Sequence, residues 1–483
     1  MGMQVRPLPE VDPSTPAPKG SAPEVEQTPS ASMSAGSRLL AVLGSWRARL
    51  ALMSVWGVLL FVAFQPGLLS SDSLDMLAQG RAGRYSDWHS PFFSFVLGKS
   101  FALTGSTWPV LALQLLVLSL GPVLLLGRVS GRRGLGALAL LVVYCLLPST
   151  WAVGVTLWKD VFNAVMLLGT VMLLTRGRPG WAFACLVFAT LTRHNAIVAS
   201  VLLVPMVVAR VPALMKERAR PFIAGGILLG ILACAPGFVE RAMGAQKSWI
   251  AGALLVFDVV GVYVREPSAM DGSPLVERWQ WTPEQLGGLY DPRSITPLLW
   301  GEPARGSIST TQVLEARDAL TREWLRVVRT HPGAYLRHRL STYSASLGLG
   351  DSSDSYYRDI GSFHRVIDPN DLGLTLRTHT AVHRALSAMR EEFPWVAASG
   401  APWLALTLAL AVVGWRRRAL DGGLMFCVAA SGACYALAYL PVCVSAEFRF
   451  YYWTAISSFV ASALWLARSS SDSVQAPALG SRS

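Results

Sequence analysis

Segments of apolar residues long enough to cross a lipid bilayer recur along this chain of 483 residues. A bilayer core about 30 Å thick is crossed by a helix of roughly 17–25 apolar residues. The candidate segments are 50–67, 107–127, 134–150, 158–175, 180–192, 195–210, 221–239, 401–415, 422–443 and 449–467. Charged residues make up only 15% of the chain, against about 25% in soluble domains. The sequence therefore excludes a soluble enzyme and predicts an all-α polytopic membrane protein.

Short basic clusters beside these segments indicate their orientation, because cytoplasmic loops carry an excess of Lys and Arg. The clusters contain Arg47 and Arg49, Arg128, Arg132 and Arg133, Arg176 and Arg178, Arg210 to Arg220, Arg416 to Arg418, and Arg468. All of them lie on the cytoplasmic side only if 180–210 crosses the membrane twice as a hairpin. We therefore predict about ten transmembrane helices with both ends cytoplasmic; one long helix over 180–210 is the alternative. The net charge of +12 follows from these clusters, so no nucleic-acid partner is predicted.

This topology divides the chain into regions inside, within and outside the membrane. They are a disordered cytoplasmic tail (1–45), an N-terminal transmembrane core (46–240) with a first outer, acidic loop (68–106), a small mixed extracytoplasmic region (241–400), C-terminal transmembrane helices (401–468) and a second disordered cytoplasmic tail (469–483). The tail composition cannot bury enough apolar surface to offset the entropy of ordering. Within the outer region, 249–264 is apolar but too short for a confident span, and it could be re-entrant or interfacial.

The unusual polar residues of the chain gather in four loops on the predicted outer face. Two acids, Asp72 and Asp75, follow the first span. The other candidates, which we assign to substrate binding, are Asp87, His89, Lys159, Asp160, Arg193, His194, Glu447, Arg449 and Tyr451. A site that needs a carboxylate base, and cations to neutralise a phosphate, would require these residue types together.

Each of these residues also has a purely structural interpretation. Asp72 could cap a helix, with Asp75 favoured by the helix dipole. Asp160 and Asn195 each stand where a span begins, which is a capping position. Lys159 could extend to the membrane interface. The arginines could pair with Glu447 or with lipid headgroups.

Three of these loops resemble the motifs of the GT-C glycosyltransferases, multi-span enzymes that use polyprenyl-phosphate sugars. The first outer loop is similar to their acidic loop, through Asp72, Asp75, Ala78, Gly83, Tyr85, His89 and Pro91. The stretch 191–196 resembles their Leu-Thr-Arg/Lys element, and 447–452 resembles an Arg-Tyr element at the start of a late span. The resemblance covers about 50–240 and 400–467, without one close protein. The chain departs from the family in the Asp-x-x-Asp spacing and in Ser90, which stands where the family has the first proline of a pair.

The resemblance implies a reaction and assigns roles to these residues. A sugar passes from a polyprenyl-phosphate carrier to a lipid, glycan or protein acceptor outside the cytoplasm, at the cell's inner membrane. Asp72 would be the base, with Asp75 as second choice. The cations Lys159, Arg193 and Arg449 would bind the phosphate, and the two histidines would position acceptor or phosphate.

No cofactor is predicted. Two carboxylates on one loop could hold a divalent ion, but they are too few to predict a metal site. The six cysteines lie in or beside apolar segments without a CxxC pair, so buried thiols are expected.

Two other function classes stay open from the residues alone. A transporter or flippase for a lipid-linked substrate would place its ionisable residues at the midplane, in paired broken helices. A non-catalytic assembly protein would explain the unusual spacing of the two acids. Substitution of Asp72 separates both classes from an enzyme.

Overall fold

The fold is known from a computed structural model that describes residues 42–127, 129–349, 364–392, 398–417 and 423–472. Within these ranges all regular structure is helical, and β-structure is limited to isolated bridges. The prediction of an all-α protein is therefore confirmed for the described residues. The predicted tails lie outside them, except for 42–45 and 469–472.

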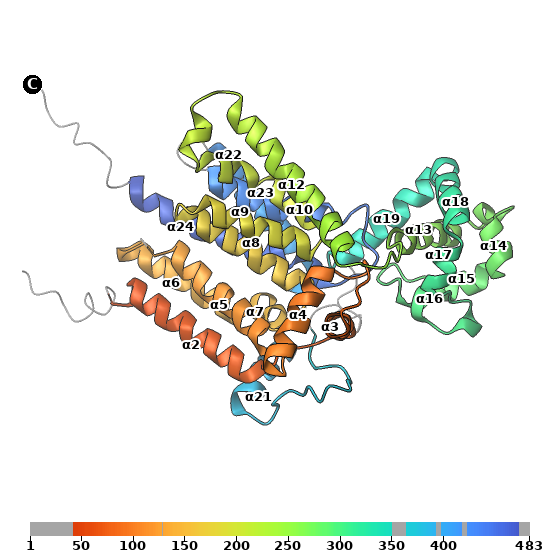
Figure 1. The fold of residues 1–483 in the computed structure, drawn as a ribbon, viewed down its shortest axis with the longest axis horizontal. Helices are drawn as coiled ribbons and strands as arrows, with labels where there is room; N and C mark the ends of the chain where they lie inside the picture. The colour runs from red at the N-terminus through yellow and green to blue at the C-terminus, as the bar shows by residue number, and fades with distance from the viewer. Residues whose placement is uncertain (1–41, 128, 350–363, 393–397, 418–422, 473–483) are drawn as a thin grey trace, which may run out of the picture. The chain divides into compact units, whose positions relative to one another are not determined.

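The predicted apolar segments are helical over most of their length. They form α2 (Trp46–Phe64), α5 (Trp108–Leu125), α6 (Gly131–Leu146) with α7 (Pro148–Gly154), α8 (Lys159–Thr175), α9 (Pro179–Thr192), α10 (Ala196–Val201) with α11 (Val204–Ala209), α12 (Arg220–Ala242), α22 (Gly400–Arg416), α23 (Gly423–Leu437) and α24 (Tyr452–Asp472). Figure 1 shows the long helices running side by side, and their contacts agree.

Four helical stretches in the described residues are long and apolar enough to cross a membrane. They are α2, α5, α12 and the stretch Phe448–Ala467, which includes most of α24; the bent pair α6–α7 makes a fifth if it is one span. A multi-pass membrane protein is consistent with these lengths. The other apolar helices have 17 residues or fewer, at or below the lower limit for a full crossing, so the ten-span topology stays a prediction.

The segment 180–210 is a hairpin. After α9 the chain turns at Arg193 to Asn195, and α11 then packs back against α9. One continuous helix would carry α11 away from α9, so the alternative of a single long helix is wrong.

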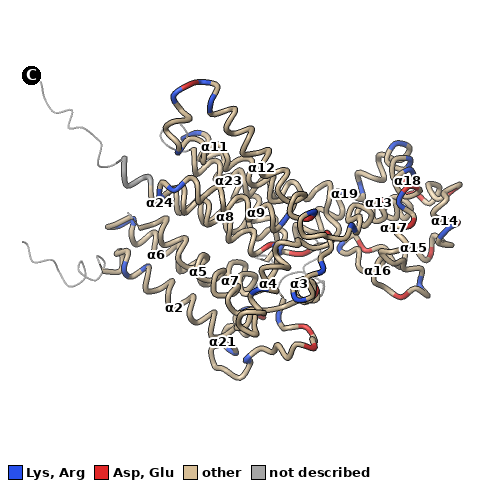
Figure 2. The backbone as a smooth tube through the Cα atoms, in the orientation of Figure 1, with Lys and Arg blue, Asp and Glu red and all other residues tan. Residues whose placement is uncertain are grey.

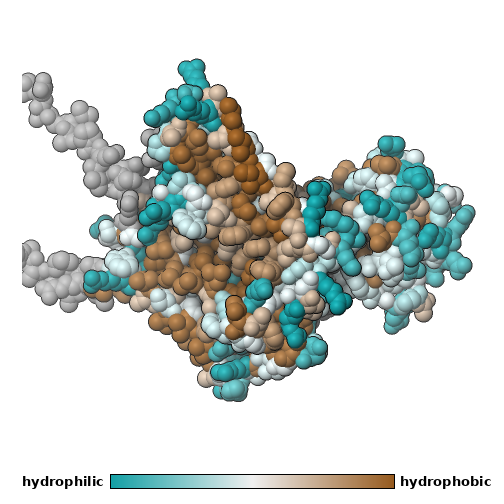
Figure 3. Space-filling view, in the orientation of Figure 1, coloured by the Kyte–Doolittle hydropathy of each residue, from teal (hydrophilic) through white to brown (hydrophobic). Residues whose placement is uncertain are grey.

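The helices differ in how much of their surface the protein covers. In the apolar window of Phe448–Ala467, 78% of the residues are buried, and α24 contacts α5, α6, α7, α8, α22 and α23. In the window of α12, only 6% are buried. Apolar side chains such as Phe222, Ile227 and Phe238 are exposed on α12. Figure 3 shows the resulting hydrophobic surface over the long helices, and Figure 2 shows few charges along their middles. An exposed apolar surface of this extent suits contact with lipid.

The region between α12 and α22 has a second hydrophobic core. The helices of this region are α13 (Ala251–Arg265), α14 (Pro274–Trp279), α15 (Pro283–Leu289), α16 (Thr296–Trp300), α17 (Thr310–Glu315), α18 (Arg317–Thr330), α19 (Pro332–Ser346) and α21 (Ala381–Glu391), with short 3₁₀ turns at Pro267–Met270 and Pro303–Arg305; another such turn, Pro212–Met215, precedes α12. Helix α21 packs against α2 and α7 and belongs to the first core. The prediction of mixed structure here is wrong for the described residues, whose regular structure is helical and whose β-structure is limited to isolated bridges.

Helix α13 accounts for the apolar segment 249–264. It contacts α15, α17, α18 and α19, and its buried side chains lie at the centre of the second core. A 15-residue apolar helix covered in this way needs no membrane. The segment is a buried core helix rather than a re-entrant or interfacial one.

The first outer loop forms two helices, α3 (Ser71–Ala82) and α4 (Pro91–Thr104), whose backbones touch where they cross. A Cβ added at Gly80 would lie 1.9 Å from the carbonyl oxygen of Ser94, and one added at Gly98 would lie 2.4 Å from the carbonyl carbon of Gly80. Only glycine allows this approach, and the crossing fixes α3, which carries both predicted catalytic acids.

We expect Gly80→Ala to lower the free energy of unfolding by about 1–3 kcal/mol, because the added methyl meets backbone that cannot rotate away. The measurement is the thermal unfolding midpoint in detergent. Gly287→Ala is the matched control, since a Cβ there meets nothing within 4 Å and alanine favours a helix. An unfolding midpoint for Gly80→Ala at or above that of the control would contradict the close crossing.

Candidate active site

Asp72 lies in the first turn of α3 and forms an ion pair across the fold. The N-cap of α3 is Ser70, so the capping role considered for Asp72 is not observed. The Asp72 carboxylate oxygen Oδ2 instead accepts a hydrogen bond of 2.7 Å from Nη1 of Arg449. The two residues are 377 positions apart in the sequence.

Besides Asp72, Arg449 contacts the carboxylate of Glu447 and the ring of Trp158. It lies in the 3₁₀ turn Phe448–Tyr451 that leads into α24. Its Nε is 2.5 Å from Oε2 of Glu447, and Nη2 donates to Oε1 of the same carboxylate at 3.1 Å. Its guanidinium carbon lies 4.8 Å from the centre of the Trp158 ring. One cation therefore joins two carboxylates, and its other face rests on an aromatic ring, an arrangement typical of arginine.

His89 connects the second acid to Lys159. Its Nε2 is 3.4 Å from Oδ2 of Asp75, and its Nδ1 is 3.2 Å from Nζ of Lys159. Burial, followed by the positive charge of Lys159, lowers the pKa of His89 to about 3. The imidazole is therefore neutral at pH 7. Because an ammonium group only donates, Nδ1 accepts from Lys159 and the ring proton lies on Nε2, toward Asp75.

Asp72 is ionised at neutral pH. Burial by itself would raise the pKa of Asp72, but the charges of Arg449 and Lys159, together with the hydrogen bond from Arg449, outweigh it and hold the pKa well below its usual range. The carboxylate is thus a stable anion while Arg449 stays in place. Loss of Arg449 would remove the strongest of the opposing charges and raise this pKa.

A second ion pair, between Arg193 and Asp160, is more deeply buried. The side chain of Asp160 is 1% exposed and that of Arg193 is 12% exposed. Nη2 of Arg193 also donates to the Tyr439 hydroxyl at 2.6 Å. Phe450 lies between the two pairs, with its ring centre 5.2 Å from the Arg193 guanidinium carbon and 5.5 Å from that of Arg449.

Asp87 and His194 belong to a neighbouring polar cluster. His194 Nε2 is 2.8 Å from Oε1 of Glu240, and Nζ of Lys247 is 2.5 Å from Oε2 of the same residue. Oδ2 of Asp87 lies 3.5 Å from Nζ of Lys247, and Oδ1 of Asp87 accepts a hydrogen bond of 2.6 Å from the backbone amide of Ser248. The cluster ties the first outer loop and the hairpin tip to the end of α12.

This second cluster lies at one end of a hollow of about 530 Å³. Its lining combines Asp87, Thr190, His194 and Glu240 with the apolar residues Ile197, Leu232, Ala233, Pro236, Gly237, Trp249, Ile250 and Ala251. Helix α12, which supplies several of the apolar residues, is the helix least covered by protein among the candidate spans.

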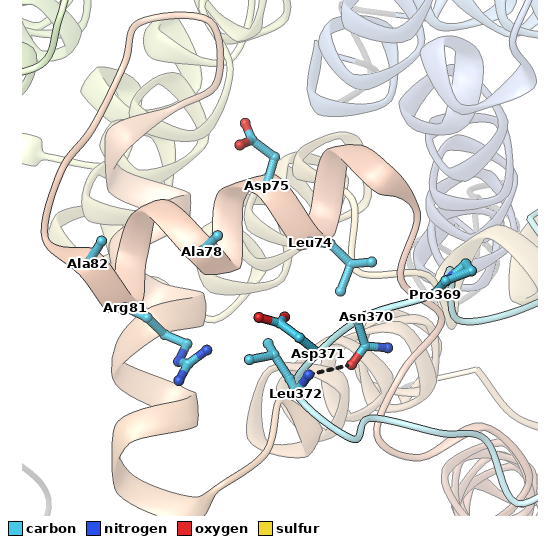
Figure 4. A pocket seen from close by; sticks show the side chains of 9 residues that line it. All are labelled: Leu74, Asp75, Ala78, Arg81, Ala82, Pro369, Asn370, Asp371 and Leu372. Carbon is cyan, nitrogen blue, oxygen red and sulfur yellow. Dashed lines mark hydrogen bonds between the residues drawn. The ribbon is translucent and has the colours of Figure 1, made fainter.

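Another hollow, of about 560 Å³, lies beside α3 (Figure 4). It is lined by Leu74, Asp75, Ala78, Arg81 and Ala82 from the helix, and by Pro369, Asn370, Asp371 and Leu372 from a distant segment. That segment is attached to the start of α3, because the backbone of Leu69 pairs with Ile367. In Figure 4 Asp75 points away from Asp371, so the two carboxylates do not face each other.

The structure places most of the predicted residues in small groups of contacting side chains. Asp72 and Glu447 contact Arg449, whereas Asp75 and Lys159 contact His89. The charge of Lys159 acts on Asp72 and thus couples these two groups. Asp160 pairs with Arg193, whose guanidinium lies over the same Phe450 ring as that of Arg449, and Asp87 and His194 belong to the neighbouring cluster. Tyr451 belongs to none of these groups: its side chain is fully buried and its hydroxyl lies 2.5 Å from that of Ser346. Asp160 is not an N-cap, and Asn195 is an N-cap without a side-chain bond.

Sequence reasoning missed several partners of these residues. Tyr439 and Glu240 are the clearest, because each completes an interaction of the hairpin tip. Glu240 is the one acidic residue of α12 and lies near its C-terminal end, which was a usable signal. No comparable signal marked Tyr439, which lies just beyond the end of α23.

Comparison with protein-family models, with curated proteins and with solved structures gave no significant match to this chain. In the described part of the chain, no group of three or more His, Cys, Asp or Glu side chains could hold a metal ion. The chemistry of the site must therefore be argued from its own residues.

Proposed function

We propose that the protein is an integral membrane glycosyltransferase of the GT-C type. It transfers a sugar from a polyprenyl-phosphate carrier to a lipid, glycan or protein acceptor on the extracytoplasmic side of the inner membrane. In this proposal the chain crosses the membrane ten times, with both ends in the cytoplasm and the loops that carry Asp72, Asp160, Arg193 and Arg449 on the outer face.

The observation that carries the proposal is the direct contact between Asp72 and Arg449. An ionised carboxylate is a proton acceptor, and a guanidinium is the side chain best suited to bind phosphate oxygens. The pair lies at the start of α24, beside Trp158 and Lys159. A base and a phosphate-binding cation thus occupy one position, as group transfer from a lipid phosphate requires.

The contact between Asp72 and Arg449 also suggests how binding of the donor would free Asp72 to act as the base. A donor phosphate would compete with Asp72 for Arg449, and each contact that it gains releases the carboxylate. Asp72 then accepts the proton of the acceptor hydroxyl or amine as that group attacks the anomeric carbon. The bond between that carbon and the phosphate oxygen breaks, and its electrons leave with the polyprenyl phosphate. Arg193 and Lys159 stabilise the charge on the departing phosphate.

The hollow against α12 supports a donor that enters from the lipid. Its apolar residues, including Leu232 and Pro236, suit an isoprenoid chain, and its polar residues include His194. His194 directly follows Arg193 in the sequence, so the hollow lies beside the segment that carries the buried ion pair.

The test is a transfer assay with purified protein in liposomes. Radiolabelled polyprenyl-phosphate sugars, hexoses and pentoses separately, are offered with a membrane extract as acceptor. We expect label from one donor to appear in the extract, and donor binding to fall at least tenfold in Arg449→Ala. Arg305→Ala is the matched control, because Arg305 forms an exposed pair with Glu302 in the outer region.

Two results of this assay would contradict the proposal. If the protein binds a donor but transfers no label to any acceptor, the enzyme proposal is wrong and a transporter or assembly role takes its place. If donor binding is equal in Arg449→Ala and Arg305→Ala, Arg449 is not the phosphate ligand.

A further inference from the structure

The region between α12 and α22, which we call the outer helical region after its predicted location, binds the segment Cys443 to Ala446 that directly precedes Glu447. The amide of Ile295 donates to the carbonyl of Val444 at 2.9 Å, and the amide of Ala446 donates to the carbonyl of Arg293 at 2.7 Å. The short antiparallel bridge between Ser294 and Ser445 lies between these two bonds. The segment is therefore fixed by backbone bonds to residues about 150 positions earlier in the sequence.

Arg339 of α19 adds a side-chain bond to the same segment. Its Nη1 donates to the carbonyl oxygen of Cys443 at 2.8 Å. Arg339 also forms an ion pair with Asp258 of α13, and both side chains are almost wholly buried, at 2% and 1% exposure. Trp324 donates to the other oxygen of Asp258 at 2.8 Å.

A buried ion pair is a poor source of stability, because removing both charges from water offsets most of their attraction. The pair between Arg339 and Asp258 instead fixes the orientation of the Arg339 guanidinium. Asp258 holds the guanidinium in place through Nη2, and Nη1 is then directed at the carbonyl oxygen of Cys443. A hydrophobic pair of the same volume could not hold a carbonyl of another segment.

On its other side the segment leads directly to Arg449. The Ser445 hydroxyl donates to Oε1 of Glu447 at 3.0 Å, and Glu447 contacts Arg449 with both carboxylate oxygens. Arg449 in turn contacts Asp72. A continuous series of polar contacts thus runs from Asp258, in the second core, to Asp72 on the first outer loop.

We propose that Arg339, oriented by Asp258, is a positioning residue that fixes the segment Cys443 to Ala446 and thereby sets the position of Arg449 relative to Asp72. The outer helical region would then take part in the geometry of the site without touching the substrate. The claim that Arg339 sets the position of Arg449 does not depend on the proposed function, whereas the expected effect on sugar transfer rests on it.

The test compares Arg339→Lys with Arg326→Lys in the full-length protein. Lysine keeps the charge beside Asp258 but lacks the planar fork that reaches Cys443. Arg326 is the matched control: it pairs with Glu323 in the same region, and none of its observed bonds reaches Cys443 to Ala446. Hydrogen–deuterium exchange is followed in peptides that cover 443–452, where we expect about tenfold faster exchange in Arg339→Lys alone.

The pH profile of transfer gives a readout that a merely structural role would not change. Arg449 holds the pKa of Asp72 low. A displaced Arg449 would let that pKa rise, so the acid limb of the profile should move to higher pH in Arg339→Lys. It should stay in place in Arg326→Lys.

Unchanged exchange in Arg339→Lys, or equal acceleration in the control, would overturn the inference. If Arg339→Lys does not fold, Ser445→Ala replaces it, because this change removes only the hydroxyl bond to Glu447. Exchange at 447–450 must then rise, or the inference is wrong. If no transfer is found for the unaltered protein, the proposed function fails, and the exchange experiment still decides the positioning role.

Discussion

Asp72→Asn is expected to reduce sugar transfer by about 10²–10⁴-fold while the protein still folds and inserts. The reduction is the usual contribution of a general base, because the amide cannot accept the acceptor's proton. The side chain of Asp72 is 34% exposed, and Arg449 keeps its pair with Glu447 when Asp72 is changed, so no buried charge is left unpaired and stability should fall by about 1 kcal/mol or less. The measurements are the initial transfer rate and the thermal unfolding midpoint of the same preparation.

Asp271→Asn is the matched control, since Asp271 is an exposed aspartate of the outer region. Its transfer rate should equal that of the unaltered protein. Asp75→Asn tests the second choice of base: Asp75 contacts His89 and is more exposed than Asp72, so we expect a smaller loss. If Asp72→Asn and Asp75→Asn both keep the full rate, neither carboxylate is the base.

Arg193→Met is expected to destabilise the fold by about 3–5 kcal/mol. Removal of one partner leaves the Asp160 carboxylate, which is 1% exposed, as an unpaired charge in the interior. The thermal unfolding midpoint in detergent should fall accordingly. Arg220→Ala provides the comparison, because its pair with Glu217 is half exposed and should contribute less than about 1 kcal/mol.

The double variant Asp160→Leu with Arg193→Met separates stability from function. With both charges gone, most of the lost stability should return, whereas donor binding should stay weak because no guanidinium remains there. Recovery of donor binding together with stability would show that Arg193 acts only within the fold. Failure of the double variant to regain stability would contradict the burial argument.

The sequence predicted the helical class well, because apolar length is a property of each segment alone. The hairpin at Arg193 also followed from local information, the basic residues on either side of 180–210. The apolar helix α13 did not follow, since a span of about 15 residues has the same composition in a membrane and in a protein core. Only its neighbours α15, α17, α18 and α19 decide between the two.

For the site, the sequence identified which residues are unusual and suggested one local pair, Arg449 with Glu447, which the structure shows; it did not indicate the partners that are distant in the sequence. Asp72 and Arg449 were both selected for their charge and their place on the outer face, and the fold brings them into contact. Tyr451 was selected because it follows Arg449, yet the turn directs it into the interior toward Ser346. A 3₁₀ turn changes which neighbours share a face, and the sequence pattern of 447–452 does not reveal that turn.

The contact between Arg449 and Asp72 also has a consequence for biogenesis. Asp72 is translated 377 residues before Arg449, and the helices from α4 to α23 lie between them in the sequence. A nascent chain that contains α3 but not yet the turn Phe448–Tyr451 therefore lacks the cation that keeps Asp72 ionised and fixed. The contact between the two residues can form only after the segment that carries Arg449 has been made.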